Sequence, residues 1–154
     1  MAGHRAFEVA IDMAQRQRDA DRRLLVQQRG QCANAEAQLT QLTGYAQETR
    51  QRWGASEGAR LLPEVLRHQL QFLQRLEQTA RMQQAVVQAQ RQRVQQAVRQ
   101  LAAAEARLAS LRHVLQQRQR AEQRVQQRHE QKETDEWAMQ RHARGIGRQL
   151  TQGI

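Results

Sequence analysis

Aromatic residues, proline and cysteine are all scarce in this chain. It holds five aromatic residues (3%), one proline and one cysteine among 154 residues, so it has few bulky side chains from which to build a globular core. Its mean hydropathy of −0.91 would also suit disorder, but the abundant residues are Gln, Arg, Glu, Ala and Leu, which favour helices over solvated coil. Because a pair of long helices needs only a narrow apolar seam, the composition indicates a coiled coil.

The chain also lacks paired cysteines, a signal peptide and a membrane-spanning run. The single Cys32 excludes an intramolecular disulfide and suits a reducing compartment. The N-terminal residues contain no apolar stretch of the kind that a signal peptide needs, and no segment approaches the roughly 18 apolar residues of a membrane helix. We therefore expect a cytoplasmic protein.

Basic residues outnumber acidic ones and give a net charge of +10. This excess suits an acidic partner, whether nucleic acid, anionic lipid or an acidic protein surface. The arginines are nevertheless dispersed among Gln and Glu, and the aromatic residues do not interleave with basic clusters as they do on nucleic-acid-binding surfaces. A solvated helical face is the simpler interpretation, so nucleic acid ranks behind a protein partner.

Apolar residues recur at alternating steps of four and three along the first third of the chain, as at the a and d positions of a coiled coil. The series is Phe7, Ile11, Ala14, Arg18, Asp21, Leu25, Gln28, Cys32, Ala35, Leu39, Leu42, Ala46, Thr49 and Trp53. Arg18, Asp21 and Gln28 form a polar weak spot within it. The pattern predicts one long helix with a single apolar face.

A second series of the same kind follows a break. It comprises Leu73, Leu76, Ala80, Gln83, Val87, Gln90, Val94, Ala97, Leu101, Ala104, Leu108, Leu111 and Leu115. A strict seven-residue repeat predicts a left-handed supercoil. The continuing positions are mostly polar: Arg118, Glu122, Val125, His129 and Lys132. The fading pattern indicates that the last part of the second helix has no helical partner.

The break between the two series contains two glycines and the sole proline, Pro63. Proline suits the first turn of a helix and breaks the interior of one. We therefore expect helix one over about residues 3–53, a tip over 54–62, helix two over about 63–143 and a frayed tail over 144–154.

A connection this short returns the second helix along the first. The predicted fold is therefore all-α, a two-helix antiparallel coiled-coil hairpin that forms a single domain over residues 1–154. If the chain reverses near residue 59, Leu42 is expected opposite Leu76, and Phe7 opposite Leu111.

No catalytic or metal-binding constellation is visible in the sequence. The five histidines lie far apart and none stands at zinc-ligand spacing, and the glycines form no phosphate-binding loop. Cys32 falls at a seam position without an evident base, so we expect an inert core thiol with no metal or redox role. Two packed helices also offer no obvious substrate pocket. We expect no enzymatic activity, no cofactor, no metal and no small-molecule substrate.

The few aromatic residues are informative by position. Trp53 falls in the seam, where core packing is the simplest interpretation. Tyr45 and Phe72 each precede a seam residue near the expected tip, a place that suits a core-flanking role and a binding role equally well. Trp137 lies beyond the paired region, where a large exposed aromatic side chain indicates a partner.

Three stretches, taken in order, carry a family resemblance. The first comprises Leu24, Leu25, Cys32, Ala35, Glu36, Gln38, Leu39, Leu42, Tyr45, Glu48 and Arg50. The second comprises Phe72, Leu76 and Glu77, and the third Gln131, Lys132, Asp135, Glu136, Trp137, Ala138, Gln140 and Arg141. Together they resemble the FliJ family of the bacterial flagellar type III export apparatus, over essentially the whole chain.

The resemblance implies a fold and a set of partners. Members of this family are similar to the rotor-stalk gamma subunit of rotary ATPases, and insert their helix termini into the pore of the hexameric export ATPase to promote its assembly and activity. The resemblance also implies contacts with the cytoplasmic domain of the export-gate membrane protein and with export chaperones. It places the protein in the cytoplasm, peripherally associated with the inner membrane at the flagellar base.

The implied contacts fall on particular residues of this sequence. The gate-contact face of the family matches Gln38, Leu42, Tyr45, Phe72 and Leu76. The sequence departs from the family at Thr49, where an aromatic residue is common, and near Thr79 and Gln83. For the ATPase contact at the helix ends we expect Phe7, Ile11, Arg124, Arg128 and Trp137.

Other functions stay open on the sequence alone. The close variant is the equivalent stalk of a virulence-type secretion system, although the motif at residues 32–50 favours the flagellar family. The alternatives from other classes are a basic nucleic-acid-binding helical protein and a purely structural coiled-coil spacer.

Overall fold

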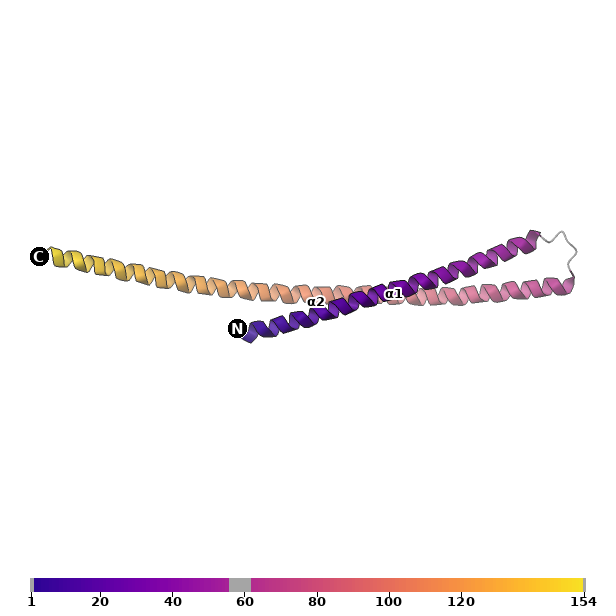
Figure 1. Ribbon diagram of the computed structural model, residues 1–154, viewed down its shortest axis with the longest axis horizontal. Helices are drawn as coiled ribbons and strands as arrows, with labels where there is room; N and C mark the ends of the chain where they lie inside the picture. Colours follow the sequence, from indigo (N-terminus) through magenta and orange to yellow (C-terminus); the bar gives the residue numbers. More distant parts are fainter. Residues whose placement is uncertain (1, 56–61, 154) are drawn as a thin grey trace. The chain divides into compact units, whose positions relative to one another are not determined.

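The computed structural model describes residues 2–55 and 62–153, which form two long helices (Figure 1). Helix α1 spans Ala2–Ala55 and helix α2 spans Pro63–Gln152. No strand occurs within the described ranges. The two helices pack against each other, which confirms the all-α helical hairpin expected from the composition and the repeat.

The start of α2 follows from its first residues. Pro63 occupies the first helical position, where its missing N–H removes no helical hydrogen bond. The backbone N–H of Leu66 donates to the carbonyl of Leu62 at 3.2 Å, and the carboxylate of Glu64 lies in the first turn, where it complements the helix dipole. Helix two therefore begins at the predicted residue. Helix one continues two residues past the predicted Trp53, and most of the expected tip falls on residues 56–61, outside the described ranges.

The end of α2 differs from the prediction. A helix ending near Ala143 with a frayed tail from residue 144 was expected, but α2 continues to Gln152. The Thr151 hydroxyl donates to the carbonyls of Gly147 and Arg148, each at 3.0 Å. A helical glycine costs about 1 kcal/mol relative to alanine. The two glycines here alternate with good helix formers and no proline follows, so their cost does not end the helix.

The chain divides into two compact units. One comprises residues 13–107 and is called here the central unit; the other comprises residues 1–12 and 108–154 and is called the terminal unit. Within the central unit α1 packs on the first half of α2, and within the terminal unit the start of α1 packs on the middle of α2. The expectation of one domain over residues 1–154 stays a prediction.

Every position of the two predicted seams is buried or half-buried. The most buried side chain is Val87, which is 1% exposed, followed by Leu108 at 2%. The polar exceptions Arg18, Asp21 and Gln28 also face inward, because heptad position rather than residue type decides which side of a helix faces its partner. The seam prediction is therefore confirmed in full, including its weak spot.

Polar seam residues are satisfied to different degrees. The side-chain amide of Gln83 donates across the interface to the carbonyl of Ala35 at 3.0 Å and to Oε1 of Gln38 at 3.1 Å. The carboxylate of Asp21 accepts a hydrogen bond from its own helix. In contrast, Oε1 of Gln28 and Oε1 of Gln90 are buried without a hydrogen-bond partner. The seam of the central unit therefore contains two incompletely satisfied amides.

Three interhelical ion pairs line one edge of the central unit, at the e positions that follow d in each heptad. They are Arg22–Glu105 at 3.5 Å, Glu36–Arg91 at 3.1 Å, and Arg50–Glu77. Each step of 14 residues, or two heptads, along α1 is matched by the same step backwards along α2. The helices are therefore antiparallel with a constant register. We call this set the ion-pair ladder.

The opposite edge is formed by the g positions that precede a in each heptad, and it is uncharged where Tyr45 meets Phe72. Taken with the ion-pair ladder, this contact places Leu42 across from Ala80 and Ala46 across from Leu76. The register expected from the tip, with Leu42 opposite Leu76, is wrong by about one helical turn. Side-chain packing and ion pairs set the register, because a connection of several residues need not lie symmetrically between its helices.

Candidate protein-binding site

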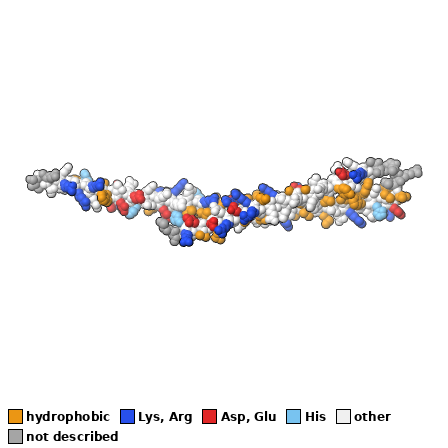
Figure 2. Space-filling view, in the orientation of Figure 1, with side chains coloured by type: hydrophobic (Ala, Val, Ile, Leu, Met, Phe, Trp, Pro, Cys, Tyr) orange, Lys and Arg blue, Asp and Glu red, His pale blue; other side chains and the backbone are white. Residues whose placement is uncertain are grey.

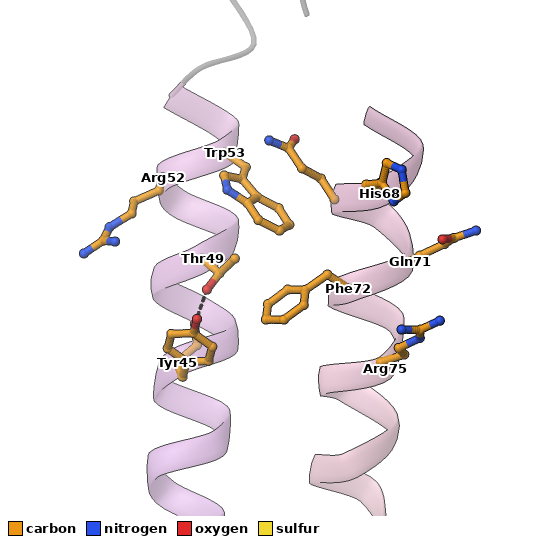
Figure 3. A pocket seen from close by; sticks show the side chains of 9 residues that line it. Tyr45, Thr49, Arg52, Trp53, His68, Gln71, Phe72 and Arg75 are labelled. Atoms are coloured by element: carbon orange, nitrogen blue, oxygen red, sulfur yellow. Dashed lines mark hydrogen bonds between the residues drawn. The ribbon is translucent and has the colours of Figure 1, made fainter. Parts of the chain in front are cut away.

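Three aromatic rings lie together at the tip end of the central unit (Figure 3). The Phe72 ring of α2 makes edge contacts with two rings of α1: Tyr45, with centroids 6.3 Å apart at 83°, and Trp53, with centroids 5.9 Å apart at 60°. Such edge-to-face pairs contribute about 0.5–1.5 kcal/mol beyond the area they bury. The three rings hold one another in place, while Tyr45 and Phe72 stay exposed.

The rings remain accessible to a partner. Tyr45 is 53% exposed and Phe72 is 42% exposed, whereas large aromatic side chains that serve only as core are mostly covered. Their g positions explain this exposure, since g flanks the seam instead of facing the other helix. This exposure is compatible with the binding role that the sequence left open for both rings.

A small residue separates the two rings of α1. Thr49 is 8% exposed, and its hydroxyl donates to the carbonyl of Tyr45 at 2.8 Å, which satisfies the polar atom within its own helix (Figure 3). Its short side chain fills little space between Tyr45 and Trp53. A groove of about 510 Å³ results, with Thr49 in its lining and all three rings along its walls.

Basic and neutral polar side chains complete the lining of this groove, which we call the aromatic groove. Arg52, His68 and Arg75 contribute the charged or chargeable groups, and Gln69 and Gln71 the neutral ones. No carboxylate belongs to the described residues that line it. In Figure 2, hydrophobic side chains gather on the visible face at this end of the hairpin. The aromatic groove is therefore apolar inside with positive charge around it.

The five residues expected at the gate-contact face lie in the central unit. Tyr45 and Phe72 are in contact, and Gln38 accepts a hydrogen bond from Gln83 of the facing helix. Leu42 and Leu76 are half-buried in the seam. Gln38, Tyr45 and Phe72 occupy g positions and the two leucines occupy the adjacent d positions, so all five share one side of the hairpin.

Sequence reasoning missed the part that Trp53 plays. It was interpreted as core because it falls in the seam, and it is indeed half-buried. Its ring also forms a wall of the aromatic groove. The signal available in the sequence was the unusual gathering of three of the five aromatic residues around one short connection.

The residues expected at the ATPase contact belong to the terminal unit. Phe7 and Ile11 are half-buried against α2, and the Arg118 guanidinium lies 4.5 Å from the centroid of the Phe7 ring. Nε2 of His4 lies 2.7 Å from Oε1 of Glu122. Phe7 and Ile11 therefore also hold the start of α1 on α2.

The other three residues expected at the ATPase contact lie on a part of α2 that no other described residue covers. Every described side chain of α2 from residue 123 to residue 151 is exposed, as the fading seam predicted. Arg124 and Arg128 are among them. Trp137 is 63% exposed, and the Arg141 guanidinium lies 5.1 Å from its ring centroid.

The single thiol is part of the packing. Cys32 is buried, and its Sγ lies 3.7 Å from Oε1 of Glu36. Burial, and secondarily the negative charge of Glu36, raises the pKa of the Cys32 thiol. The core position expected for Cys32 is confirmed. Within residues 2–55 and 62–153, no three His, Cys, Asp or Glu side chains are placed to share a metal ion.

Neither described helix contains a stretch that is both long and apolar enough to cross a membrane. Fold and site together define a class: a two-helix antiparallel coiled coil whose central unit carries a partly exposed aromatic groove and whose terminal unit carries a stretch of α2 that no other described residue covers. Residues 4–147 match the family described as flagellar FliJ protein, and the chain belongs to this family of flagellar type III export components. No curated protein and no solved structure matched the chain.

Proposed function

We propose that this chain is the stalk-like coiled coil of a flagellar type III export apparatus, which binds the hexameric export ATPase and links it to the export gate. In this proposal the chain is not an enzyme. It promotes ATPase assembly and activity, and it also meets export chaperones. Its place is in the cytoplasm at the inner membrane of the flagellar base.

The observation that carries the proposal is the family match over residues 4–147, together with the presence of one exposed surface in each of the two units. The gate contact is assigned to Gln38, Leu42, Tyr45, Phe72 and Leu76, which share one side of the hairpin. Exposed aromatic residues such as Tyr45 and Phe72 are frequent energetic centres of protein interfaces. Their mutual contact pre-orders them, which lowers the entropy lost on binding.

The ATPase contact is assigned to the terminal unit. Arg124, Arg128 and Trp137 stand on a helix that no other part of the described chain covers. Exposed arginines suit an acidic pore, and such a contact weakens with salt. The chain contributes no catalytic group to hydrolysis. It acts by binding one arrangement of the ATPase subunits more tightly than another, which shifts the equilibrium between them.

The test is the ATP hydrolysis rate of the purified cognate export ATPase, measured with and without this chain at low and moderate salt. Stimulation is expected, and the charge-reversed variant Arg124→Glu/Arg128→Glu should lose it. Arg93→Glu/Arg99→Glu is the matched control, because these arginines are also exposed on α2 but lie in the central unit. Loss of stimulation in both variants would indicate a general charge effect instead of a located contact.

The gate contact needs its own measurement. Tyr45→Ala/Phe72→Ala should abolish binding to the cytoplasmic domain of the cognate gate protein while stimulation of the ATPase persists. Absence of stimulation, together with no effect on hexamer assembly, would refute the stalk function and leave a coiled-coil adaptor.

A further inference from the structure

We propose that the aromatic groove receives a single bulky apolar side chain from an acidic segment of its partner, and that Trp53 and Arg75 are binding residues of this site. The proposal rests on the proposed function, since it takes the gate protein's cytoplasmic domain as the partner. It goes further in naming the chemistry of the bound segment and two residues outside the set assigned to the gate contact.

The first argument is the shape of the site. Thr49 places a short side chain between Tyr45 and Trp53, while Phe72 closes the space from the other helix. Both ring pairs are in contact, so the walls are already ordered before a partner arrives. A volume of about 510 Å³ in the open groove accommodates a Leu, Phe or Trp side chain together with part of its backbone. Well-ordered hollows lined by aromatic rings are where interface anchors insert.

The second argument is the charge of the side chains at the rim of the groove. Arg75 and His68 of α2 and Arg52 of α1 line the aromatic groove, and no acidic side chain among the described residues does so. On the other edge of the same helices every interhelical charge of the ladder is matched by an opposite one. The Arg75 guanidinium therefore has no carboxylate beside it among the described residues that line the groove. Charge complementarity selects an acidic segment around the apolar anchor.

The two arguments predict different changes in affinity, and in its dependence on salt, for two variants. Trp53→Ala removes one wall and should weaken binding about tenfold or more, since anchoring Trp residues typically cost over 1.4 kcal/mol on truncation and 1.4 kcal/mol is tenfold in Kd. Arg75→Glu reverses one rim charge and should weaken binding about three- to tenfold at low salt, with the difference from wild type shrinking at high salt.

The chain offers a matched control for the charge change. Arg81 lies six residues further along α2, is also exposed, and lines a groove on the opposite edge beside Glu77. Arg81→Glu should leave binding within about twofold of wild type, since it alters the same net charge away from the site. Circular dichroism of each variant tests whether the hairpin still forms, and because Arg75 is exposed, Arg75→Glu is expected to fold even if Trp53→Ala does not.

The experiment is a titration of the full chain with the purified cytoplasmic domain of the cognate gate protein. Binding of every variant to the gate domain is measured by isothermal titration calorimetry, and Trp53 fluorescence in a Trp137→Phe background, which leaves one indole in the chain, reports peptide binding. A parallel titration uses a short peptide with one central Phe among Asp and Glu residues, and a second peptide in which the acidic residues are replaced by Lys. The expected result is weaker gate binding by Trp53→Ala and Arg75→Glu, unchanged binding by Arg81→Glu, and a saturable fluorescence change with the acidic peptide alone.

The outcomes separate this inference from the proposed function. If wild type binds the gate domain and Tyr45→Ala/Phe72→Ala abolishes binding, but Trp53→Ala and Arg75→Glu bind like wild type, the groove inference is wrong and the gate contact stands. If wild type does not bind the gate domain at all, the proposed function fails at that step, and the two peptides still test the groove. An equal response to both peptides overturns the acidic specificity, and concentration-dependent self-association that Trp53→Ala abolishes would make a second copy the occupant.

Discussion

The buried amides of Gln28 and Gln90 predict that this hairpin can be stabilised by removing polar groups from its seam. Both occupy d positions about one turn apart on facing helices, and both are half-buried with Oε1 buried and unpartnered. A buried acceptor without a hydrogen bond costs about 1–3 kcal/mol. Leucine at d replaces that cost with apolar burial.

The magnitude follows from this geometry. Because each side chain is half-buried, each Gln→Leu change should contribute near the lower end of the range, about 1–2 kcal/mol. The double variant Gln28→Leu/Gln90→Leu should therefore gain about 2–4 kcal/mol. At about 3 °C per kcal/mol for a chain of this length, the unfolding midpoint should rise by about 6–12 °C. The measurement is thermal unfolding followed by circular dichroism at a helical wavelength.

The control is Gln27→Leu/Gln92→Leu, which makes the same chemical change at two exposed positions of the same helices. It should alter stability by no more than about 0.5 kcal/mol. The reasoning is refuted if the seam variant melts no higher than wild type, or if the surface variant gains as much. Either result would mean that the two amides are satisfied in solution, or that helix propensity alone explains the gain.

Three further outcomes are expected. Val87→Ala should destabilise the hairpin by about 2 kcal/mol, since this is its most buried side chain, which chemical denaturation would measure as a lower midpoint. At pH 8, Cys32 of the folded chain should react with iodoacetamide at least about tenfold more slowly than Cys32 of the unfolded chain. The raised pKa leaves less thiolate at a given pH, and burial blocks access to the sulfur. Equal rates would contradict the buried position. Glu36→Arg should cost about 0.5–1 kcal/mol at low salt by opposing Arg91, and adding Arg91→Glu should recover it; failure of the second change to rescue the first would rule out a direct pair.

The seam could be predicted from the sequence because heptad position alone decides which residues face inward. Asp21 illustrates this, being 9% exposed despite its charge. The start of α2 was equally accessible, since Pro63 restricts where a helix can begin. Both features depend on local chemistry within a few residues of the position concerned.

Features that depend on the pairing of distant residues could not be predicted in the same way. The register was misplaced by about a turn, because no local signal states which heptad of α1 meets which heptad of α2. The Trp53–Phe72 contact depends on that register and was missed with it. The helical end of α2 was missed for another reason: Gly145 and Gly147 weaken a helix without ending it.

The ion-pair ladder has a consequence for how the hairpin folds. A seam that repeats every seven residues is nearly as well satisfied when the helices are misaligned by one or two heptads. The charges alternate in sign along each helix: Arg22, Glu36 and Arg50 on α1, and Glu77, Arg91 and Glu105 on α2.

A slip of seven residues removes all three pairs, and a slip of 14 residues brings like charges together, for instance Glu36 against Glu77 or Glu105. Misaligned hairpins are therefore penalised electrostatically even where their apolar contacts are intact. Three weak surface pairs, each contributing little to stability, thus discriminate between alternative alignments that burial alone leaves nearly equal in energy.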